Sequence, residues 1–218
     1  VVNNGYVPDA RWVEWRITMP NEVNEKVARM SGIIEKRYGF HEKKFKNAKE
    51  IIDNYGKQFF ALLDECYADL YGTIPFSEKL VDQTIGMFKL IIDPKYVSII
   101  LDKDGEMAGF GVCFASIAEA LQKSKGRYLP LGWLRLLRAI KNPKRLELAL
   151  IAVKPKYQRM GVTAIIINNI MERVVADGNI KYCDTGCQLE TNTSVINALD
   201  MLDRELIRRK ICFIKKLS

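Results

Sequence analysis

The chain of 218 residues contains no apolar run of about eighteen residues or more, so its sequence predicts no membrane-spanning helix. It begins with Val1, and no charged segment followed by an apolar one marks a targeting signal. Because no initiating methionine is present, we expect the chain to be part of a longer protein. We also expect no membrane partner.

Histidines and paired cysteines are scarce as well. His41 is the only histidine, so a zinc site or a Cys/His nucleophile is not expected. Cys183 and Cys187 fall on one predicted strand, where about 13 Å would separate them, too far for a disulfide. We therefore expect no metal, reduced thiols and a cytoplasmic location. The five cysteines are scattered along the chain: Cys66, Cys113, Cys183, Cys187 and Cys212.

Acidic residues are outnumbered, with 26 Asp and Glu against 34 Lys and Arg and a formal net charge of +8. Such a surplus suits an anionic ligand or nucleic acid. The basic residues form separate clusters, at 43–46, 135–145, 154–159 and 208–216, and acidic residues divide them. Because aromatic residues do not interleave with them as on a reading surface, we expect nucleic-acid binding to be weak and strongly salt-dependent.

One unit in the chain points to a phosphate site. An apolar strand, Leu146 to Val153, leads through a loop, Lys154 to Gly161, into a helix that runs from Val162 to about Asp177. The first turn of a helix carries unpaired N–H donors and a partial positive charge, which together attract phosphate. The alternative is a simple strand-to-helix turn in which Gly161 relieves backbone strain.

The pattern Val153-x-Pro155-x-Tyr157-Gln158-x-x-Gly161-Val162 resembles the acetyl-CoA signature of the GNAT acetyltransferase superfamily. In that family the loop and the helix start hold the cofactor pyrophosphate, and backbone N–H groups of the signature strand hold the acetyl carbonyl. Thr163 stands where the family usually has a second small residue. The resemblance implies an acetyl-CoA site made by Ile151, Ala152, Val153, Gln158, Arg159, Met160, Gly161, Val162, Thr163 and Asn192. Helix capping explains Asn192 equally well.

Hydrophobic periodicity predicts strands at 11–18, 96–101, 106–115, 146–153, 180–189 and 206–217. It predicts helices near 23–34, from 48 to about 70, and at 77–92, 117–125, 131–141, 162–177 and 192–202. In the 131–141 helix the apolar residues are expected to face inward and the basic residues outward. An Asp-x-Asp-Gly turn at 102–105 lacks the downstream Glu of a calcium loop.

From residue 47 onward this order is similar to that of GNAT proteins, with an extra helical stretch at 116–141. The resemblance implies an α/β fold with a mixed, mostly antiparallel central sheet flanked by helices and the signature βα unit at 146–177. It divides the chain into a GNAT-like acyltransferase domain at 47–218 and an N-terminal strand-helix extension at 1–46. The overall pattern is similar to GNAT proteins that carry a degenerate N-terminal lobe, and 1–46 would be the end of such a lobe.

In the GNAT mechanism an amine attacks the thioester directly, so the site needs a base and an acid. Glu147 is the candidate base, because it is the one charge in an apolar strand and burial there would raise its pKa. The alternative is that Glu147, next to the start of the strand, simply faces water. The family's usual acid is a Tyr on the helix after the next strand, but Leu199 takes that place and Val195 takes the place of a preceding Ala. The acid is therefore unassigned.

Three hypotheses follow. The first is an acetyl-CoA-dependent N-acetyltransferase acting on a small-molecule or peptide amine. The second is a non-catalytic domain of the same fold that binds CoA or a partner. The third is nucleic-acid binding.

Overall fold

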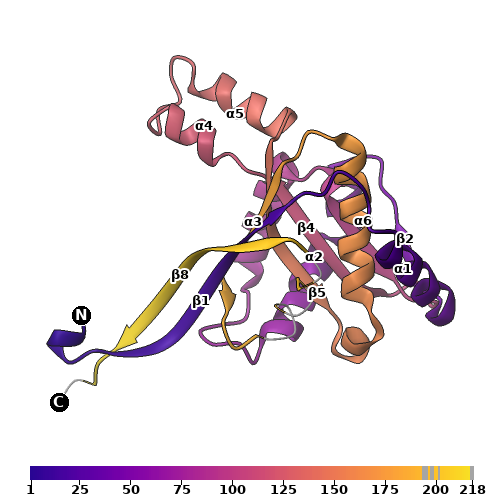
Figure 1. Cartoon of the computed structure of the whole chain (residues 1–218), viewed down its shortest axis with the longest axis horizontal. Helices are drawn as coiled ribbons and strands as arrows, with labels where there is room; N and C mark the ends of the chain where they lie inside the picture. Colours follow the sequence, from indigo (N-terminus) through magenta and orange to yellow (C-terminus); the bar gives the residue numbers. More distant parts are fainter. Residues whose placement is uncertain (193–195, 197–198, 201, 217–218) are drawn as a thin grey trace.

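The computed structural model describes residues 1–192, 196, 199–200 and 202–216. Within these residues, one sheet of eight strands runs through the molecule (Figure 1). The strand order is β2-β3-β4-β5-β6-β1-β7, and β8 pairs with β1. Neighbouring strands are antiparallel except β5 and β6, which confirms the mixed, mostly antiparallel sheet. The strands are β1 (Val7–Thr18), β2 (His41–Lys43), β3 (Val97–Leu101), β4 (Met107–Ala115), β5 (Arg145–Val153), β6 (Tyr182–Thr185), β7 (Gln188–Leu189) and β8 (Arg204–Ile214).

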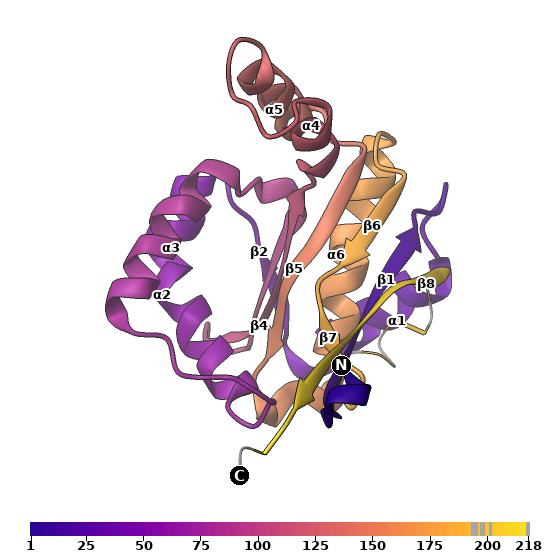
Figure 2. The ribbon, with the colours of Figure 1, turned by 90° about the vertical axis from the view of Figure 1, so that its left-hand side faces the viewer.

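Helices cover both faces of this sheet. Helices α2 and α3 lie on one face, and α6 lies on the other with α1 beside it. Helices α4 and α5 connect β4 to β5 and stand beyond the ends of these two strands (Figure 2). The helices are α1 (Glu25–Tyr38), α2 (Ala48–Tyr67), α3 (Glu78–Ile91), α4 (Ala118–Lys123), α5 (Gly132–Lys141) and α6 (Val162–Asp177). Among the described residues, every helix is too short or too polar to cross a bilayer.

Local sequence explains where these helices begin and end. The side chains of Asn24, Asn47 and Ser77 accept hydrogen bonds from first-turn amides of α1, α2 and α3, which satisfies donors that the helix itself leaves unpaired. Gly39 ends α1 with φ of 73°, a backbone conformation that side chains with a Cβ rarely adopt. Each of these helix termini is therefore explained by residues within one turn of it.

The core has two layers, one on each side of the sheet. On the α2 face, Phe59 and Phe110 are fully buried and stack with ring centroids 4.4 Å apart. On the α6 face, Ile165 and Ile166 pack on β4 and β5 without any exposure. A Cβ on Gly111 of β4 would collide with Ile166, so this glycine allows α6 to lie directly on the strand.

The predicted strand at 180–189 is wrong in one respect, because Gly186 and Cys187 break it into β6 and β7. Strand β6 pairs with β5, whereas β7 pairs with Trp12 and Val13 of β1. The second half of this segment therefore follows β1 and leaves β5. The helix predicted at 192–202 falls largely on 193–195, 197–198 and 201, which lie outside the described residues.

The boundary expected at residue 46 does not coincide with a boundary in the sheet. Strand β1 lies between β6 and β8, and β2 forms the opposite edge beside β3. Residues of the N-terminal extension thus complete the same sheet as the signature unit. The interpretation of 1–46 as the end of a preceding lobe stays a prediction.

Candidate functional site

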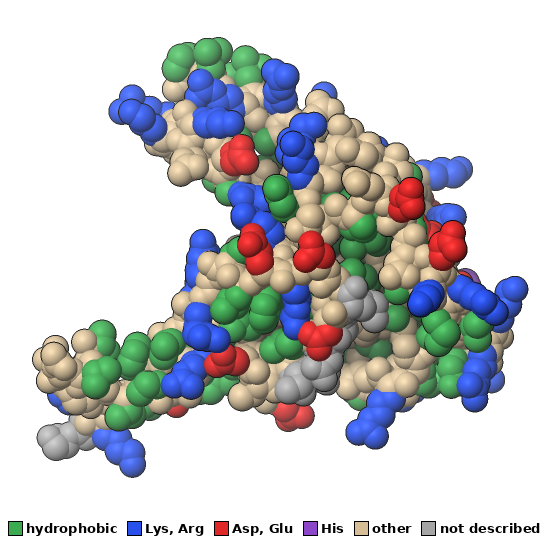
Figure 3. Space-filling model, in the orientation of Figure 1, with side chains coloured by type: hydrophobic (Ala, Val, Ile, Leu, Met, Phe, Trp, Pro, Cys, Tyr) green, Lys and Arg blue, Asp and Glu red, His purple; other side chains and the backbone are tan. Residues whose placement is uncertain are grey.

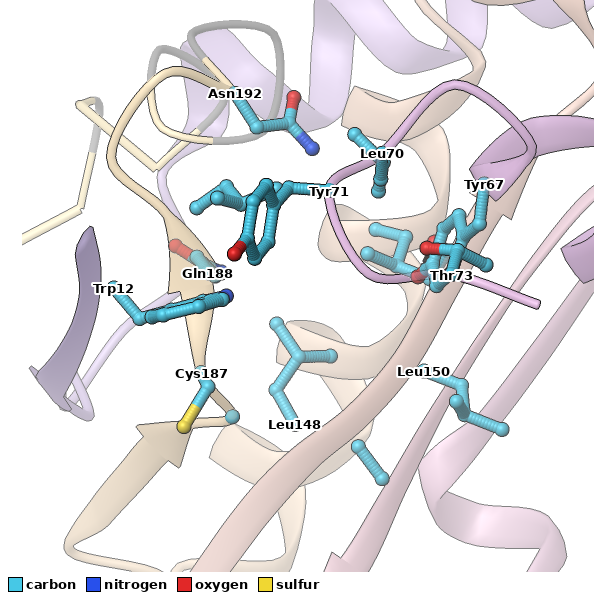
Figure 4. A pocket seen from close by; sticks show the side chains of 14 residues that line it. Trp12, Tyr67, Leu70, Tyr71, Thr73, Leu148, Leu150, Cys187, Gln188 and Asn192 are labelled. Atoms are coloured by element: carbon cyan, nitrogen blue, oxygen red, sulfur yellow. Dashed lines mark hydrogen bonds between the residues drawn. The ribbon is translucent and has the colours of Figure 1, made fainter. Parts of the chain in front are cut away.

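A cleft opens where β5 and β6 separate. Their pairing ends at Leu148 and Thr185, and the Gly186 amide then donates to the Leu148 carbonyl at 3.1 Å. Beyond that point β5 is paired with β4 alone among the described strands, so its other edge borders a cavity of about 200 Å³. Side chains from β1, the β6–β7 bend, β5 and the end of α2 line it (Figure 4).

The free edge of β5 presents the backbone groups of Ile151 and Val153. The Tyr67 hydroxyl donates to the Ile151 carbonyl at 3.0 Å, and the Cys66 thiol and the Gln158 amide donate to the Val153 carbonyl at 3.2 and 3.4 Å. In an extended strand the N–H and C=O of one residue point to the same edge. The N–H groups of Ile151 and Val153 therefore face away from β4, as a carbonyl-holding site requires.

Ala152 lies differently from its two neighbours. It pairs with Phe110 in the ladder to β4, and the Lys154 amide two residues later donates to the Ala108 carbonyl at 2.9 Å. Because successive residues alternate between the two edges, the Ala152 N–H points to β4. Of the three signature-strand residues predicted to hold a carbonyl, the structure brings Ile151 and Val153 to the free edge and places Ala152 on the other.

The loop after β5 leads into the N-terminus of α6. Pro155–Met160 form a 3₁₀ turn, Gly161 follows with φ of 81°, and α6 begins at Val162 with neither a side-chain cap nor an acidic residue in its first turn. Gln158 and Arg159 are exposed, Met160 and Thr163 are half-buried, and Val162 is fully buried in the core. An uncapped N-terminus on a helix of 16 residues fits a phosphate group.

Asp102 in the β3–β4 turn supports this loop. Its carboxylate accepts a hydrogen bond from the Tyr157 hydroxyl at 2.6 Å. Burial alone would raise the pKa of Asp102, but this bond, together with those from the amides of Glu106 and Asp104, outweighs burial and lowers it. The ionised carboxylate therefore anchors the loop. Within the described part of the chain, no group of three His, Cys, Asp or Glu side chains could hold a metal.

Gly161 is explained by its own backbone and by α1. Its φ of 81° is unfavourable for other residues, and a Cβ there would lie 2.6 Å from Cδ1 of Ile34. The space that a side chain would take therefore faces α1. A substitution at Gly161 would disturb this packing as well as any phosphate, so it is a poor probe of cofactor binding.

Glu147 is exposed, which agrees with the alternative that it faces water and not with the burial that would raise its pKa. Its carboxylate accepts a hydrogen bond from the Ser116 hydroxyl at 2.6 Å, and it lies on the part of β5 that still pairs with β6 at Asp184. The α4–α5 segment stands away from the sheet (Figure 2). Its role as the base stays a prediction.

Leu199 is 2% exposed and packs into the core beneath α6. The position where the family usually has an acid therefore contributes to packing here, and Val195 lies outside the described residues. Asn192 lines the cleft, as a cofactor contact would (Figure 4).

Tyr67 is a functional candidate that the sequence did not reveal. It is the last residue of α2, lines the cleft, and places its hydroxyl on the strand edge at Ile151. Burial raises the pKa of this phenol, so it stays protonated near neutral pH. Helical periodicity marks Tyr67 only as the end of an amphipathic helix, and its place beside β5 follows from the fold.

Two further polar groups lie on the opposite side of the cleft from Tyr67 (Figure 4). Gln188 lines the cleft, and its Oε1 is buried and has no hydrogen-bond partner among the described residues. The Cys187 thiol lies 3.0 Å from the Glu14 carboxylate and 3.0 Å from the Lys210 ammonium. Burial opposes ionisation of Glu14, but hydrogen bonds from Cys187 and Lys210 and the charges of Lys210 and Arg208 lower its pKa.

Comparison with known proteins agrees with this arrangement. A model of the acetyltransferase (GNAT) family matches residues 56–200, which is more than half of the chain. The chain belongs to the GNAT family. This match includes the free edge of β5, the loop and α6, and it confirms the family that the signature residues indicated.

Individual relatives of this GNAT protein are distant. A "Bacterial ceramide synthase" from Caulobacter vibrioides is 33% identical over 99 residues, which cover 44% of this chain and 26% of that relative. A GCN5-related N-acetyltransferase from Sphaerobacter thermophilus has a TM-score of 0.52 at 13% identity, over 96% of this chain and 54% of that one. A tandem GNAT protein from the clavulanic acid biosynthesis pathway has a TM-score of 0.51 at 10% identity, over 97% of this chain and 55% of that one. The chain thus spans about a quarter to a half of these proteins' lengths.

Proposed function

We propose that this GNAT protein is an acyl-CoA-dependent N-acyltransferase in which an amine attacks the thioester directly. The main observation that supports this proposal is the free edge of β5, which borders a cleft. The loop after β5 leads to the uncapped N-terminus of α6. Acyl-CoA, when bound, supplies the activated thioester, and the signature resemblance makes acetyl-CoA the expected donor. The proposal is tested by incubating the protein with acyl-CoA and amines and detecting amide products by mass spectrometry.

The residues around the cleft suggest a division of roles. The N–H groups of Ile151 and Val153 hold the acyl carbonyl, and the first turn of α6 holds the pyrophosphate. The Tyr67 hydroxyl is placed to give a proton to the departing thiolate.

The acceptor belongs to the class of small-molecule or peptide amines, and two observations favour one with an apolar chain. Trp12, Leu70, Leu150 and Leu189 contribute apolar side chains to a lining that also contains polar ones. One relative is named a ceramide synthase, and ceramide is an N-acylated lipid. A panel that crosses acetyl-CoA and fatty acyl-CoA donors with short and long-chain amines separates these choices.

The second candidate function is a non-catalytic GNAT domain that binds CoA or a partner. It is favoured by Leu199, which occupies the usual acid position and is buried in the core. Acyl-CoA binding without turnover of any amine in the panel would select this function over the first.

Replacing Thr163 with Asp is expected to weaken acyl-CoA binding by about tenfold or more. A carboxylate in the first turn of α6 repels the pyrophosphate, yet it favours the helix itself by about 0.3–1 kcal/mol. Calorimetric titration should thus show lower affinity in a protein whose thermal stability is unchanged or higher. Thr163→Ser is the matched control. An affinity equal to wild type in folded Thr163→Asp protein would remove the pyrophosphate assignment.

Replacing Glu147 with Gln tests the base. General-base catalysis is worth about 10²–10⁴-fold, so kcat/KM should fall by at least about 10²-fold at neutral pH while acyl-CoA affinity changes little. The acidic limb of the pH–rate profile should also disappear. Ser116→Ala is the control, because it removes the hydrogen bond to Glu147 and keeps the carboxylate. Normal turnover by the Gln variant would mean that water or another group is the base.

A further inference from the structure

The segment 116–144, which we call the α4–α5 hairpin, exposes an unusual amount of apolar surface. Helices α4 and α5 pack on each other and stand away from the sheet (Figures 1 and 2). Six large apolar side chains in the connecting loop and α5 are between 45% and 76% exposed, namely Tyr128, Leu129, Leu131, Trp133, Leu134 and Leu137. A cluster of this kind on a projecting element marks an interaction surface.

Helix α5 turns its apolar side outward, contrary to the prediction that its apolar residues face inward. Trp133, Leu134 and Leu137 lie within about 100° around the helix axis and are all exposed. Only Leu136 and Ile140 of the predicted inner face are half-buried. The sequence pattern of an amphipathic helix was correct, but the hairpin provides no core to cover most of its apolar side.

The same segment has a strong surplus of positive charge. It contains seven Lys or Arg residues and one acidic residue, Glu119, a net +6 out of +8 for the whole chain. In Figure 3, hydrophobic side chains cap the outer end of the hairpin, with Lys and Arg side chains beside and below them. Apolar residues thus project furthest, and the cations lie nearer to the body of the protein.

We propose that the α4–α5 hairpin docks on the surface of an anionic lipid bilayer. Exposed Leu and Trp side chains suit the boundary between headgroups and acyl chains, and the neighbouring cations suit anionic headgroups. A soluble polyanion would use the cations but leave the leucines in water. Helix α5 has 10 residues and so lies in the interface without spanning it. This surface was not expected from the sequence, where no membrane partner was predicted.

Docking is tested by cosedimentation with vesicles, a measurement that needs neither CoA nor catalysis. It can therefore fail or succeed independently of the proposed acyltransferase function. At about 0.15 M salt, we expect binding to phosphatidylcholine vesicles with about 30% phosphatidylserine to exceed binding to pure phosphatidylcholine by about tenfold or more. On binding, the fluorescence of Trp133 should shift to the blue, and Trp133→Phe should remove that shift but keep the binding.

Variants separate the apolar and the basic contributions. The double variant Trp133→Ser/Leu137→Ser should lower the vesicle partition coefficient by about tenfold or more. Changing Lys125, Arg138 and Lys141 together to Gln should remove the preference for anionic vesicles. Arg135 is left unchanged because its side chain donates to the Lys123 carbonyl at 2.7 Å and holds the hairpin together.

The control is a second pair of exposed apolar residues on another helix. Met87 and Leu90 of α3 are 58% and 80% exposed, and Met87→Ser/Leu90→Ser should leave vesicle binding unchanged. Circular dichroism checks that each variant is folded. The proposal would be overturned if the two double variants lost vesicle binding equally, or if the wild-type protein did not bind vesicles.

Two other outcomes would assign a different binding partner to the α4–α5 hairpin and overturn the proposal of bilayer docking. The first is binding to heparin or DNA that survives Trp133→Ser/Leu137→Ser while vesicles are not bound, which would indicate a soluble polyanion. The second is a dimer in sedimentation analysis that this double variant abolishes without any vesicle binding, which would indicate a second copy of the chain.

Discussion

Tyr67→Phe is expected to lower kcat by about 10²-fold or more and to leave acyl-CoA affinity nearly unchanged. The hydroxyl lies on the strand edge where the acyl carbonyl is proposed to bind, and burial keeps the phenol protonated by raising its pKa. A protonated phenol can supply the proton that a thiolate needs as it leaves, a contribution of about 10²–10⁴-fold. Steady-state kinetics and calorimetry on the same protein measure the two quantities.

A thioester with a more acidic leaving thiol distinguishes catalysis from positioning. Such a thiolate leaves without a proton, so the Phe variant should lose much less activity with an aryl thioester than with acyl-CoA. Tyr71→Phe is the control, because Tyr71 also lines the cleft but its hydroxyl bonds to Asp9. An equal loss with both thioesters would show that the Tyr67 hydroxyl only holds β5 in place.

Phe110→Ala should reduce the free energy of unfolding by about 3–5 kcal/mol, a large share of the 5–15 kcal/mol typical of a domain. Phe110 is fully buried at the centre of β4, stacks on Phe59 and pairs with Ala152 on the signature strand. The substitution leaves a cavity that the surrounding β-sheet cannot close. Urea unfolding monitored by circular dichroism measures the change.

Phe110→Leu is the matched comparison for this prediction. It keeps most of the apolar volume, so its cost should stay near or below about 1.5 kcal/mol. A cost for Phe110→Ala no larger than that for Phe110→Leu would mean that the core layer on the α2 face is less tightly packed than the stacking of Phe59 on Phe110 indicates.

The sequence predicted those parts of the fold that local patterns determine. The prediction of the signature unit at 146–177 was correct because an apolar strand, a glycine in the loop and the helix after it are each visible in a short stretch of sequence. The helix starts at Asn47 and Ser77 are likewise local capping events. The sheet class was then implied by the resemblance of the signature and of the element order to the GNAT family.

Features that depend on distant contacts were not predictable. After the bend at Gly186 the chain pairs with β1 in β7 and no longer pairs with β5. Nothing near Gly186 in the sequence indicates this change of partner. The apolar strand around Glu147 left both burial and exposure possible, and only the structure shows that this side chain is exposed. Tyr67 reaches the cleft only because α2 lies across β5.

The position of β1 links the two ends of the chain to ligand binding. Val7 pairs with Ile214 at the tip of the β1–β8 ribbon, and Trp12 of the same β1 lines the cleft together with residues of β5. A ligand held between Trp12 and β5 binds only when β1 is in the sheet, so by mass action it also favours the pairing of β8 with β1. Occupancy of the cleft and closure of the chain into one continuous sheet are therefore thermodynamically coupled, although the residues involved lie at opposite ends of the sequence.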